Sequence, residues 1–352
     1  MGRDERGRPV RRWVYGRTRQ EVVQALGRLR EQRRLGKLPA PGRLTVGEFL
    51  RAWLADVVAP SVRPKTLESY GLAVRRVVRV LGPVRLSELG PHHVQHLLRR
   101  LEEQAVGPRA RHLTFEALRA ALNHAKRMGL MESNPCTAIK PPRARPRQFR
   151  TWTAEEARRF LDVAQQDRYY GVFALALFCG LRRGEALGLR WSDVDLNAGV
   201  ARITRQLQEI GGEITFPEPK SAASKRLVYL PGPVVEALQR RLTEAQQEGT
   251  YSPDGLVFTD TQGGPVRPSN LLRRHFYPLV EKAEVPRIRF HDLRHTSATL
   301  ALQAGVHPRT LAGLLGHSRP ALTMQTYAHV IPLLEREAAE RIARVLDNNL
   351  TT

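Results

Sequence analysis

Four short motifs in the second half of the chain contain side chains suited to chemistry on a phosphodiester. In-line attack on such an ester adds negative charge in the transition state, and two guanidinium groups, those of Arg182 and Arg294, can clamp and neutralise it. The Tyr327 hydroxyl is a candidate nucleophile, but its usual pKa near ~10 means that it needs neighbouring cations and a base such as His291. The motifs are Gly180-Leu181-Arg182-Arg183-Gly184-Glu185, Pro219-Lys220-Ser221, His291-Asp292-Leu293-Arg294 and Leu315-Gly316-His317-Ser318, with Tyr327 ten residues after His317.

The spacing within the motifs favours residues that act together. His291 and Arg294 are three positions apart and share one face if the segment is a helix, so both can reach one phosphate. Glu185 follows Arg182 at the same interval and can orient it or a neighbouring histidine. The alternative interpretations are a surface arginine at 182 and a half-buried core tyrosine at 327, although the leucines around Arg182 indicate a packed segment.

The histidine spacing also raises the question of a zinc site. His291 and His295 are four positions apart, as in many catalytic zinc sites that add a third ligand. However, an arginine lies between them and no glutamate does, and a dication repels a guanidinium group. We therefore expect no metal and no other cofactor at these residues.

With all four motifs in this order and at this spacing, the chain resembles the tyrosine recombinase family, in particular its phage-type integrases. The resemblance implies a mainly α-helical, multi-domain fold, with a helical core-binding domain and an α-rich catalytic domain that has a small antiparallel β-sheet. It also implies an enzyme that cleaves and rejoins DNA strands through a 3′-phosphotyrosine intermediate and so integrates or excises a mobile element. On this resemblance the catalytic residues are Arg182, Lys220, His291, Arg294, His317 and Tyr327, and Glu185 supports them.

The leaving 5′-oxygen of such a reaction needs a proton, and a lysine on a hairpin turn is the expected general acid. Lys220 and Lys225 both lie in this region, and the family pattern favours Lys220. Because the covalent ester preserves the energy of the cleaved bond, rejoining needs no ATP.

The elements that must position these residues belong to a strongly basic chain. Its 352 residues include 57 Lys and Arg against 34 Asp and Glu, a net charge of +23, and 50 of the 57 are arginine. Residues 1–150 carry +20 of this charge and residues 151–352 only +3. Because the planar guanidinium group suits phosphate, the first 150 residues are predicted to bind nucleic acid. The codon usage of a GC-rich genome is an alternative reason for the arginine-to-lysine ratio, although not for the net charge.

Composition and resemblance together divide the chain into four segments. Residues 1–42 are predicted to be a basic N-terminal extension or a degenerate arm-binding domain. The helical core-binding domain follows over 43–139, and a basic interdomain linker, rich in proline, over 140–151. The catalytic domain with its C-terminal helix covers 152–352.

Apolar residues at helical spacing and alternating β-branched residues predict the elements within these segments. A capping box is expected where Thr153 precedes Glu156 at the start of the catalytic domain. After Tyr327 an amphipathic helix is expected to dock on its own domain or, as in the family, on a neighbouring protomer. The predicted helices begin near Thr18, Thr45, Thr66, Pro91, Thr114 and Thr153, and the predicted strands cover 11–15, 199–206 and 226–230.

Arginines on or beside the helices of the second segment, and in the linker, are the candidate DNA contacts. A linker this basic is expected to follow a phosphate backbone, and a solvated flexible spacer is the alternative. The candidates are Arg75, Arg76, Arg79, Arg109, Arg111, Arg143, Arg145 and Arg147.

The expected partners are double-stranded DNA recombination sites and three further copies of the chain, as a homotetramer in the synaptic complex. A directionality factor or a DNA-bending host protein is a further expected partner. No apolar stretch approaches the ~20 residues that a membrane span needs, and no secretory signal is visible. With only two cysteines, Cys136 and Cys179, no disulfide framework is expected either, and the protein is predicted to be cytoplasmic and nucleoid-associated.

Three alternative functions remain open at this point. A chromosome-dimer resolvase of the same superfamily is one, although the basic segment before residue 43 favours a mobile-element integrase. A type IB topoisomerase shares the chemistry but needs no partner site. A DNA-binding regulator without cleavage explains the charge but not the set of catalytic-type residues.

Overall fold

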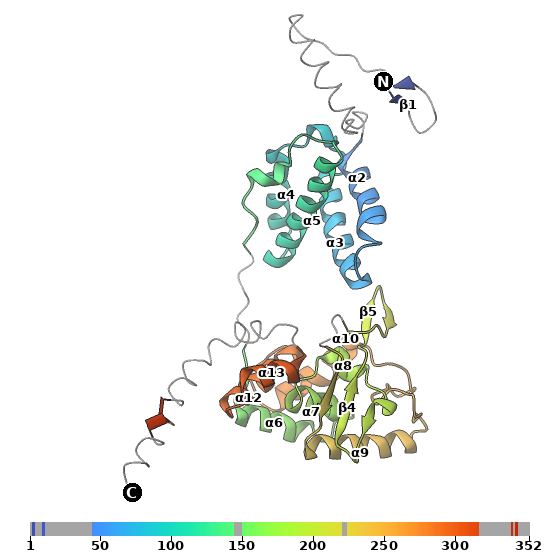
Figure 1. Ribbon diagram of the computed structural model, residues 1–352, viewed down its shortest axis with the longest axis vertical. Coiled ribbons are helices and arrows are strands. Elements are labelled where there is room, and N and C mark those ends of the chain that lie inside the picture. The colour runs from blue at the N-terminus through green and yellow to red at the C-terminus, as the bar shows by residue number, and fades with distance from the viewer. Residues whose placement is uncertain are drawn as a thin grey trace, which may run out of the picture. The chain divides into compact units, whose positions relative to one another are not determined.

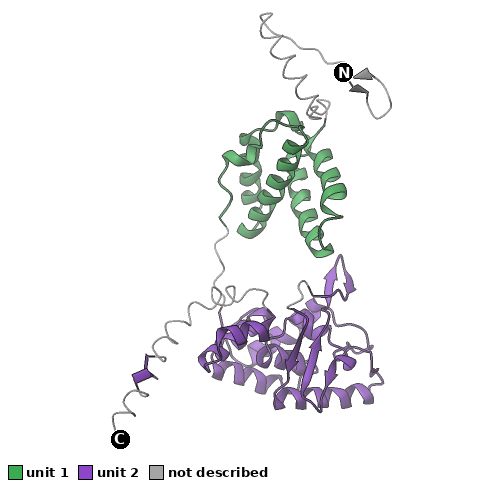
Figure 2. Ribbon diagram, viewed as in Figure 1, with its two compact units in different colours: residues 1–146 green, residues 147–352 purple. Residues whose placement is uncertain are grey.

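The chain divides into two compact units, residues 1–146 and 147–352 (Figure 2). The division falls inside the predicted linker 140–151, and the assignment of four segments with distinct roles stays a prediction. The structure is a computed structural model, and it describes residues 2–3, 9–10, 44–143, 150–219, 224–316, 339–340 and 342–343.

The first unit contains a bundle of α-helices, as its apolar spacing predicts (Figure 1). Proline occupies the first turn of α3, α4 and α5, where its missing N–H group has no helical partner to lose. For this reason α5 begins at Pro108, earlier than the predicted Thr114. The elements are α2 (Val46–Ala52), the π-helical turn η1 (Trp53–Val58), α3 (Pro64–Leu81), η2 (Leu86–Glu88), α4 (Pro91–Glu103), α5 (Pro108–Arg127) and η3 (Pro135–Ala138), preceded by the paired strands β1 (Gly2–Arg3) and β2 (Pro9–Val10).

The apolar stripes of these helices form a single core. A capping box begins the bundle: the backbone N–H of Glu48 donates to the Thr45 hydroxyl, and the Glu48 carboxylate accepts from the Thr45 N–H at 2.9 Å. Because the stripes turn inward, Arg75 and Arg79 of α3 stay on the solvent side. The buried side chains include Phe49, Leu50, Trp53, Val74, Val77, Leu81, Leu97, Phe115, Leu118 and Leu122.

The second unit packs around α7 (Tyr170–Phe178), whose residues from Gly171 to Leu177 are all buried. This helix is apolar on every side and lies in the middle of the core, as a helix without a polar face must. The Thr153–Glu156 capping box opens α6, as predicted, with the Glu156 N–H 3.1 Å from the Thr153 hydroxyl. The helices are α6 (Ala154–Ala164), α7 (Tyr170–Phe178), α8 (Arg183–Leu187), η4 (Trp191–Asp193), α9 (Gly232–Gln247), α10 (Pro268–Asn270), η6 (Leu271–Phe276), α11 (Tyr277–Lys282), α12 (Phe290–Gln303) and α13 (Pro308–Leu315).

A small antiparallel sheet, whose strand β4 is labelled in Figure 1, packs beside these helices. Its strand order is β3-β4-β7. It comprises β3 (Val194–Asp195), β4 (Val200–Ile203) and β7 (Arg226–Tyr229), and Ala201 of β4 pairs with Val228 of β7. The predicted strands 199–206 and 226–230 cover β4 and β7. This sheet and the helices around it confirm the expected fold class, mainly α with a small antiparallel sheet.

A separate hairpin, β5 (Gln208–Ile210) and β6 (Glu213–Thr215), was not predicted. Its strands are three residues long, too short for an alternating pattern to be visible. The Gly211-Gly212 pair at its turn is the one sequence signal that points to it, since both residues have positive φ angles there.

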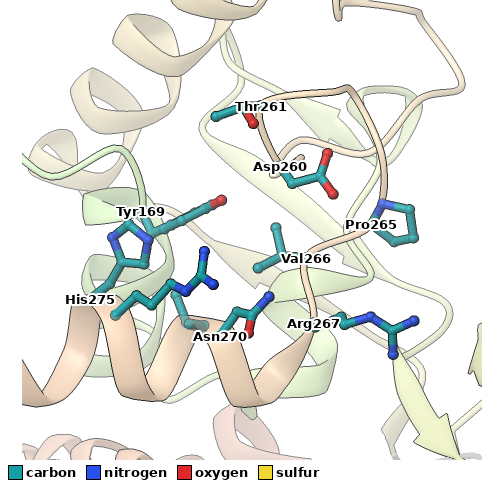
Figure 3. Close-up of a pocket in the computed structure, with 10 residues that line it drawn as sticks. Tyr169, Asp260, Thr261, Pro265, Val266, Arg267, Asn270 and His275 are labelled. Atoms are coloured by element: carbon teal, nitrogen blue, oxygen red, sulfur yellow. The ribbon is translucent and has the colours of Figure 1, made fainter. Parts of the chain in front are cut away.

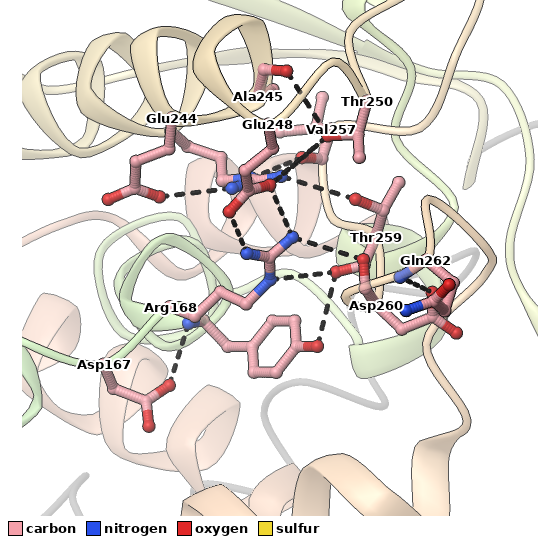
Figure 4. Close-up of polar contacts among 12 residues, drawn as sticks. Asp167, Arg168, Glu244, Ala245, Glu248, Thr250, Val257, Thr259, Asp260 and Gln262 are labelled. Carbon is pink, nitrogen blue, oxygen red and sulfur yellow. Dashed lines mark hydrogen bonds and ion pairs between the residues drawn. The ribbon is translucent and has the colours of Figure 1, made fainter.

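An ion pair between Arg168 and Glu248 joins the C-terminal end of α9 to the segment that precedes α7 (Figure 4). The Arg241 side chain, 3% exposed, donates to Glu244 at 3.2 Å and to Glu248 at 3.0 Å, and Arg168 donates to the same Glu248 from the other side. The hydrogen bond from Arg168, together with the charge and hydrogen bond of Arg241, lowers the pKa of Glu248 to about 2.

Several predicted elements lie outside the described residues. They are the strand over 11–15, the helix that begins near Thr18 and most of the helix after Tyr327, of which residues 339–340 and 342–343 are described as helical. Within the described part of the chain, no helix is long and apolar enough to cross a membrane.

Candidate active site

Arg182 and Glu185 form one ion-paired unit at the start of α8. Arg182 is the residue before the first turn, and its backbone N–H donates to the Glu185 carboxylate at 3.0 Å. Its guanidinium Nη1 donates to the same carboxylate at 2.6 Å. Glu185 is 2% exposed, whereas the Arg182 side chain is 32% exposed, so the carboxylate holds the guanidinium from the protein side and leaves part of it facing solvent.

Glu185 stays ionised although it is buried. Burial alone would raise the pKa of its carboxyl group, but the charges and hydrogen bonds of Arg226 and then Arg182 outweigh burial and lower it. A buried carboxylate between two guanidinium groups is a fixed negative charge, and it can orient both of them.

Arg294 lies on α12 and is almost completely buried. Its Nη1 donates to the carbonyl of Gly180 at 2.6 Å, and its Nη2 donates to the carbonyl of Leu315 at 2.5 Å. One of these carbonyls belongs to Gly180 (φ 63°), and the other directly precedes Gly316 (φ 64°). Both glycines have left-handed backbone, a conformation that favours glycine over other residues. The side chain therefore joins the two segments that lead into Arg182 and His317.

His291 lies one turn before Arg294 on the same helix and is accessible to solvent. The surrounding protein atoms, and then the charges of His295, Arg294 and Arg182, lower the pKa of His291 to about 4. A neutral imidazole at pH 7 can accept a proton.

The beginning of α12 is fixed by a second capping pair. The Asp292 carboxylate, 3% exposed in the buried core, accepts from the Arg289 backbone N–H at 2.8 Å and from the Arg289 Nε at 3.0 Å. On the next turn, Thr296 accepts a hydrogen bond from the Trp152 N–H at 3.1 Å. These bonds fix the helical frame from which His291 and Arg294 project.

The other predicted catalytic residues, Lys220, His317 and Tyr327, lie outside the described residues. The competing lysine, Lys225, is exposed and pairs with Glu218 at 2.8 Å. Among the predicted set, the described part of the chain therefore brings together Arg182, Glu185, His291 and Arg294.

Sequence reasoning missed Arg226, which takes part in this cluster. Its Nη2 lies 3.1 Å from the Glu185 carboxylate, and its Nε donates to the Leu314 carbonyl at 2.8 Å. Arg226 lies on the same face of β7 as the buried Val228, two residues later, whereas Leu227 and Tyr229 are exposed. An arginine on the inward face of a predicted strand is the signal that could have identified it.

The predicted DNA-binding arginines differ in exposure. Arg76 is half-buried, and so is Arg111, whose guanidinium group pairs with Glu102. Exposed positions are occupied by Arg75, Arg79, Arg109 and Arg143, whereas Arg145 and Arg147 lie outside the described residues.

A cavity of about 250 Å³ opens elsewhere in the second unit (Figure 3). Two of its basic residues are already paired, His275 with Asp167 at 2.9 Å and Arg267 with Glu209 at 2.9 Å. None of the four described candidate residues lines it. The lining comprises Tyr169, Asp260, Thr261, Pro265, Val266, Arg267, Asn270, Leu271, Arg274 and His275.

Metal-ligating side chains do not gather in the described residues. No group of three or more His, Cys, Asp or Glu side chains that could hold a metal ion occurs among them. The expectation of a metal-free reaction stays a prediction.

Comparisons with known proteins identify the family to which the chain is similar. The model of the phage integrase family matches residues 150–332. The "Tyrosine recombinase XerC-like" protein of Caldanaerobacter subterraneus subsp. tengcongensis is 28% identical over 97% of this chain and 94% of its own length. The integrase of Mycobacterium phage L5 is 30% identical over 82% of this chain and 76% of its own.

Among solved structures, the Tn1549 transposon integrase in complex with a circular intermediate DNA has a similar fold. The two structures align with a TM-score of 0.71 and 22% sequence identity, over 85% of this chain and 99% of the other.

Proposed function

The chain belongs to the phage integrase family and is a tyrosine recombinase, and from this premise we propose that Tyr327 forms the covalent bond to DNA. It is a site-specific integrase, whose relatives come from phages and other mobile elements. The observation that carries the proposed site is the hydrogen bond from Arg294 to the Gly180 carbonyl at 2.6 Å, which holds α12, and with it His291, against the segment that leads into Arg182. Such a cluster suits one phosphate and its developing charge.

In the proposed first step, the Tyr327 oxygen attacks the phosphorus, and the bond from phosphorus to the 5′-oxygen breaks. His291 accepts the phenol proton, and Lys220 gives a proton to the leaving 5′-oxygen. Arg182 and Arg294 neutralise the charge on the non-bridging oxygens, and His317 is proposed to join them. Rejoining reverses each transfer, with a 5′-hydroxyl as nucleophile, so no external energy source is consumed.

Arg294 serves two purposes in this proposal. Its Nη1 and Nη2 groups donate to the backbone carbonyls of Gly180 and Leu315. Its charge is therefore fixed in place by backbone groups while it still acts on a phosphate. Fixed charges of this kind need no reorganisation during the reaction.

The assembly is proposed to contain four copies of the chain. Two duplexes have four strands, and one nucleophile per copy cleaves one strand, so an exchange needs four copies. The helix predicted after Tyr327 would dock on a neighbouring copy, and a directionality factor or a DNA-bending host protein would complete the complex. Exposed arginines of the first unit, such as Arg75 and Arg109, are proposed to contact the DNA backbone.

The covalent adduct tests the proposed function. A suicide substrate, nicked near the cleavage point so that the cleaved end diffuses away, should trap wild-type protein on DNA. Tyr327→Phe removes one oxygen and keeps the ring, so it should bind DNA and form no adduct. An adduct formed by Tyr327→Phe would show that another group is the nucleophile.

The proton donor is tested with a matched substrate. Lys220→Ala should cleave slowly because the 5′-oxygen lacks its acid, and a 5′-bridging sulfur should rescue it, since a thiolate leaves without a proton. The same sulfur should not rescue Tyr327→Phe. If sulfur fails to rescue Lys220→Ala, the acid lies elsewhere, and Lys225 is the next residue to test. Cleavage lost in EDTA and restored by zinc or magnesium would contradict the metal-free mechanism.

A further inference from the structure

Arg226 is a buried arginine that touches two separate parts of the candidate site. Its side chain, 7% exposed, lies at the start of β7. The Nη2 and Nη1 groups lie 3.1 and 3.4 Å from the two Glu185 carboxylate oxygens. On its other edge, the Nε donates to the Leu314 carbonyl at 2.8 Å. One planar group thus joins a carboxylate of α8 to a carbonyl of α13.

The carboxylate end of this bridge leads to the candidate clamp. Glu185 accepts from Arg182 Nη1 at 2.6 Å, so Arg226 and Arg182 share a single negative charge. With two partners, the carboxylate is held from both sides and its position is fixed. If Arg226 were absent, Arg182 would carry the whole ion pair, and more of its charge would be neutralised by Glu185 instead of acting on a phosphate.

The carbonyl end of the bridge leads to the end of α13. The last carbonyls of a helix have no partner within it. Arg226 takes the carbonyl of Leu314, and Arg294 takes the next one, that of Leu315, at 2.5 Å. Two buried guanidinium groups therefore cap consecutive carbonyls directly before Gly316, where the helix ends.

We propose that Arg226 is a positioning residue for the recombination reaction: through Glu185 it sets the Arg182 guanidinium, and through Leu314 it sets the end of α13. The inference rests on the proposed function, because it assigns Arg226 to the machinery of that same site. The role needs the geometry of the guanidinium group, whose three nitrogens reach both partners at once. A lysine ammonium has the same charge but is a single point and cannot span them.

A purely structural role is the competing interpretation, since breaking a buried ion pair destabilises a protein whatever its place. Arg241 offers a matched control. Its side chain is buried to a similar degree, pairs with the carboxylates of Glu244 and Glu248, and donates to the Val257 carbonyl at 3.2 Å. None of these partners belongs to the candidate site, so its loss should affect folding alone.

The experiment uses the full-length protein and compares Arg226→Gln, Arg226→Lys and Arg241→Gln with the wild type. Three quantities are measured: the rate of adduct formation on a suicide substrate at saturating protein, the affinity for the intact site, and the melting temperature. We expect Arg226→Gln to slow adduct formation by on the order of 10²-fold at unchanged affinity, the scale of a reacting group displaced by ~1 Å. Arg241→Gln should lower the melting temperature and leave the rate unchanged below it.

Arg226→Lys keeps the buried charge and so separates charge from geometry, including in the case where Arg226→Gln does not fold. We expect it to remain slow. A wild-type rate for Arg226→Lys would show that charge alone suffices and would overturn the positioning role. The positioning role would also be overturned if Arg241→Gln lost rate in the same proportion to its loss of melting temperature as Arg226→Gln does. The rate would then simply follow stability in both variants.

A double-mutant cycle tests the route through Glu185. If Arg226 acts on Arg182 through this carboxylate, Arg226→Gln combined with Glu185→Gln should lose less rate than the product of the two single losses. Losses that multiply in full would contradict this route. Failure of the wild type to form any adduct would refute the proposed function itself, whereas wild-type adduct with an equally fast Arg226→Gln would refute only this inference.

Discussion

Arginine has different environments in the two units of the chain. In the first unit, Arg75 and Arg79 of α3 are exposed on the solvent side of the bundle. In the second, the side chains of Arg226, Arg241 and Arg294 are almost completely buried, and each of their guanidinium groups donates to carboxylate or carbonyl oxygens of the protein. These arginines of the first unit are thus surface charges, whereas these three of the second are fixed parts of its interior.

The difference follows from the energetics of charge. An exposed guanidinium group loses almost no hydration, so it can be placed anywhere, but its field is screened by salt. A buried one is stable only if its donors are satisfied, and its position is then fixed to within a hydrogen bond. Affinity is therefore expected to depend on the first unit and to be salt-sensitive, whereas the geometry of cleavage depends on the second.

The largest expected effect comes from a buried arginine. Arg294→Ala should abolish adduct formation and also destabilise the second unit, because the carbonyls of Gly180 and Leu315 lose their donors at a cost of about 1–3 kcal/mol each. Denaturant unfolding and the suicide-substrate assay measure the two effects. If Arg294→Ala kept the stability and activity of the wild type, this buried arginine would have no larger role than the exposed arginines of the first unit.

Exposed arginines of the first unit should give a smaller, salt-dependent effect. The double variant Arg75→Ala with Arg79→Ala should weaken DNA binding and reduce the slope of log affinity against log salt by about 1 for each phosphate that is no longer neutralised. Cleavage at saturating protein should be unchanged. Titrations at several salt concentrations measure the slope, and a slope equal to that of the wild type would mean that neither arginine binds a phosphate.

Acidification should affect the second unit through His291. Its pKa in the folded protein is lowered to about 4, below the usual value of 6.5, so its contribution to stability is present above pH 6.5 and is lost as the pH falls towards 4. Glu248, with a pKa lowered to about 2, loses its contribution only below the usual 4.5. Unfolding measured between pH 7 and 4 should show less pH dependence in His291→Gln than in the wild type. Identical curves would mean that the imidazole is as easily protonated in the folded protein as in the unfolded one.

The smallest effect is expected where an arginine of the first unit is already paired. The guanidinium group of Arg111 is half-buried and bound to Glu102, whereas Arg109 is exposed two residues before it. Arg111→Ala should therefore weaken DNA binding less than Arg109→Ala. An equal loss in binding titrations would show that DNA displaces the ion pair.

The sequence predicts the residues of the site better than it predicts their support. Arg182, Glu185, His291 and Arg294 were identified from spacing and family pattern, because chemistry restricts the residue types and helices restrict the intervals. Arg226 was not, since its partners, Glu185 and Leu314, are 41 and 88 residues away along the chain. The alternation along β7 can mark Arg226 as inward-facing, but a single sequence does not indicate which distant residues it contacts.

Prediction of the fold from the sequence is limited in the same way. Long periodic helices such as α3 and α5 were predicted, because their apolar stripes repeat over many turns. The hairpin β5–β6 was missed, because three-residue strands contain too few alternations and are stabilised by their partner. The boundary of α5 was misplaced because the helix starts at a proline before its apolar stripe begins.

Binding and chemistry can be separated in one experiment that compares an arginine of the second unit with two of the first. Arg182→Ala, in the second unit, and the double variant Arg75→Ala with Arg79→Ala, in the first, are compared for site affinity and for single-turnover cleavage at saturating protein. Arg182→Ala should slow cleavage by ~10²–10³-fold, the scale for loss of one group that stabilises transition-state charge, with affinity nearly unchanged. The double variant should lose affinity and cleave at the wild-type rate once saturated. If both proteins lose affinity and rate to similar extents, arginines of the two units do not differ in role, and the proposed division between binding and cleavage is wrong.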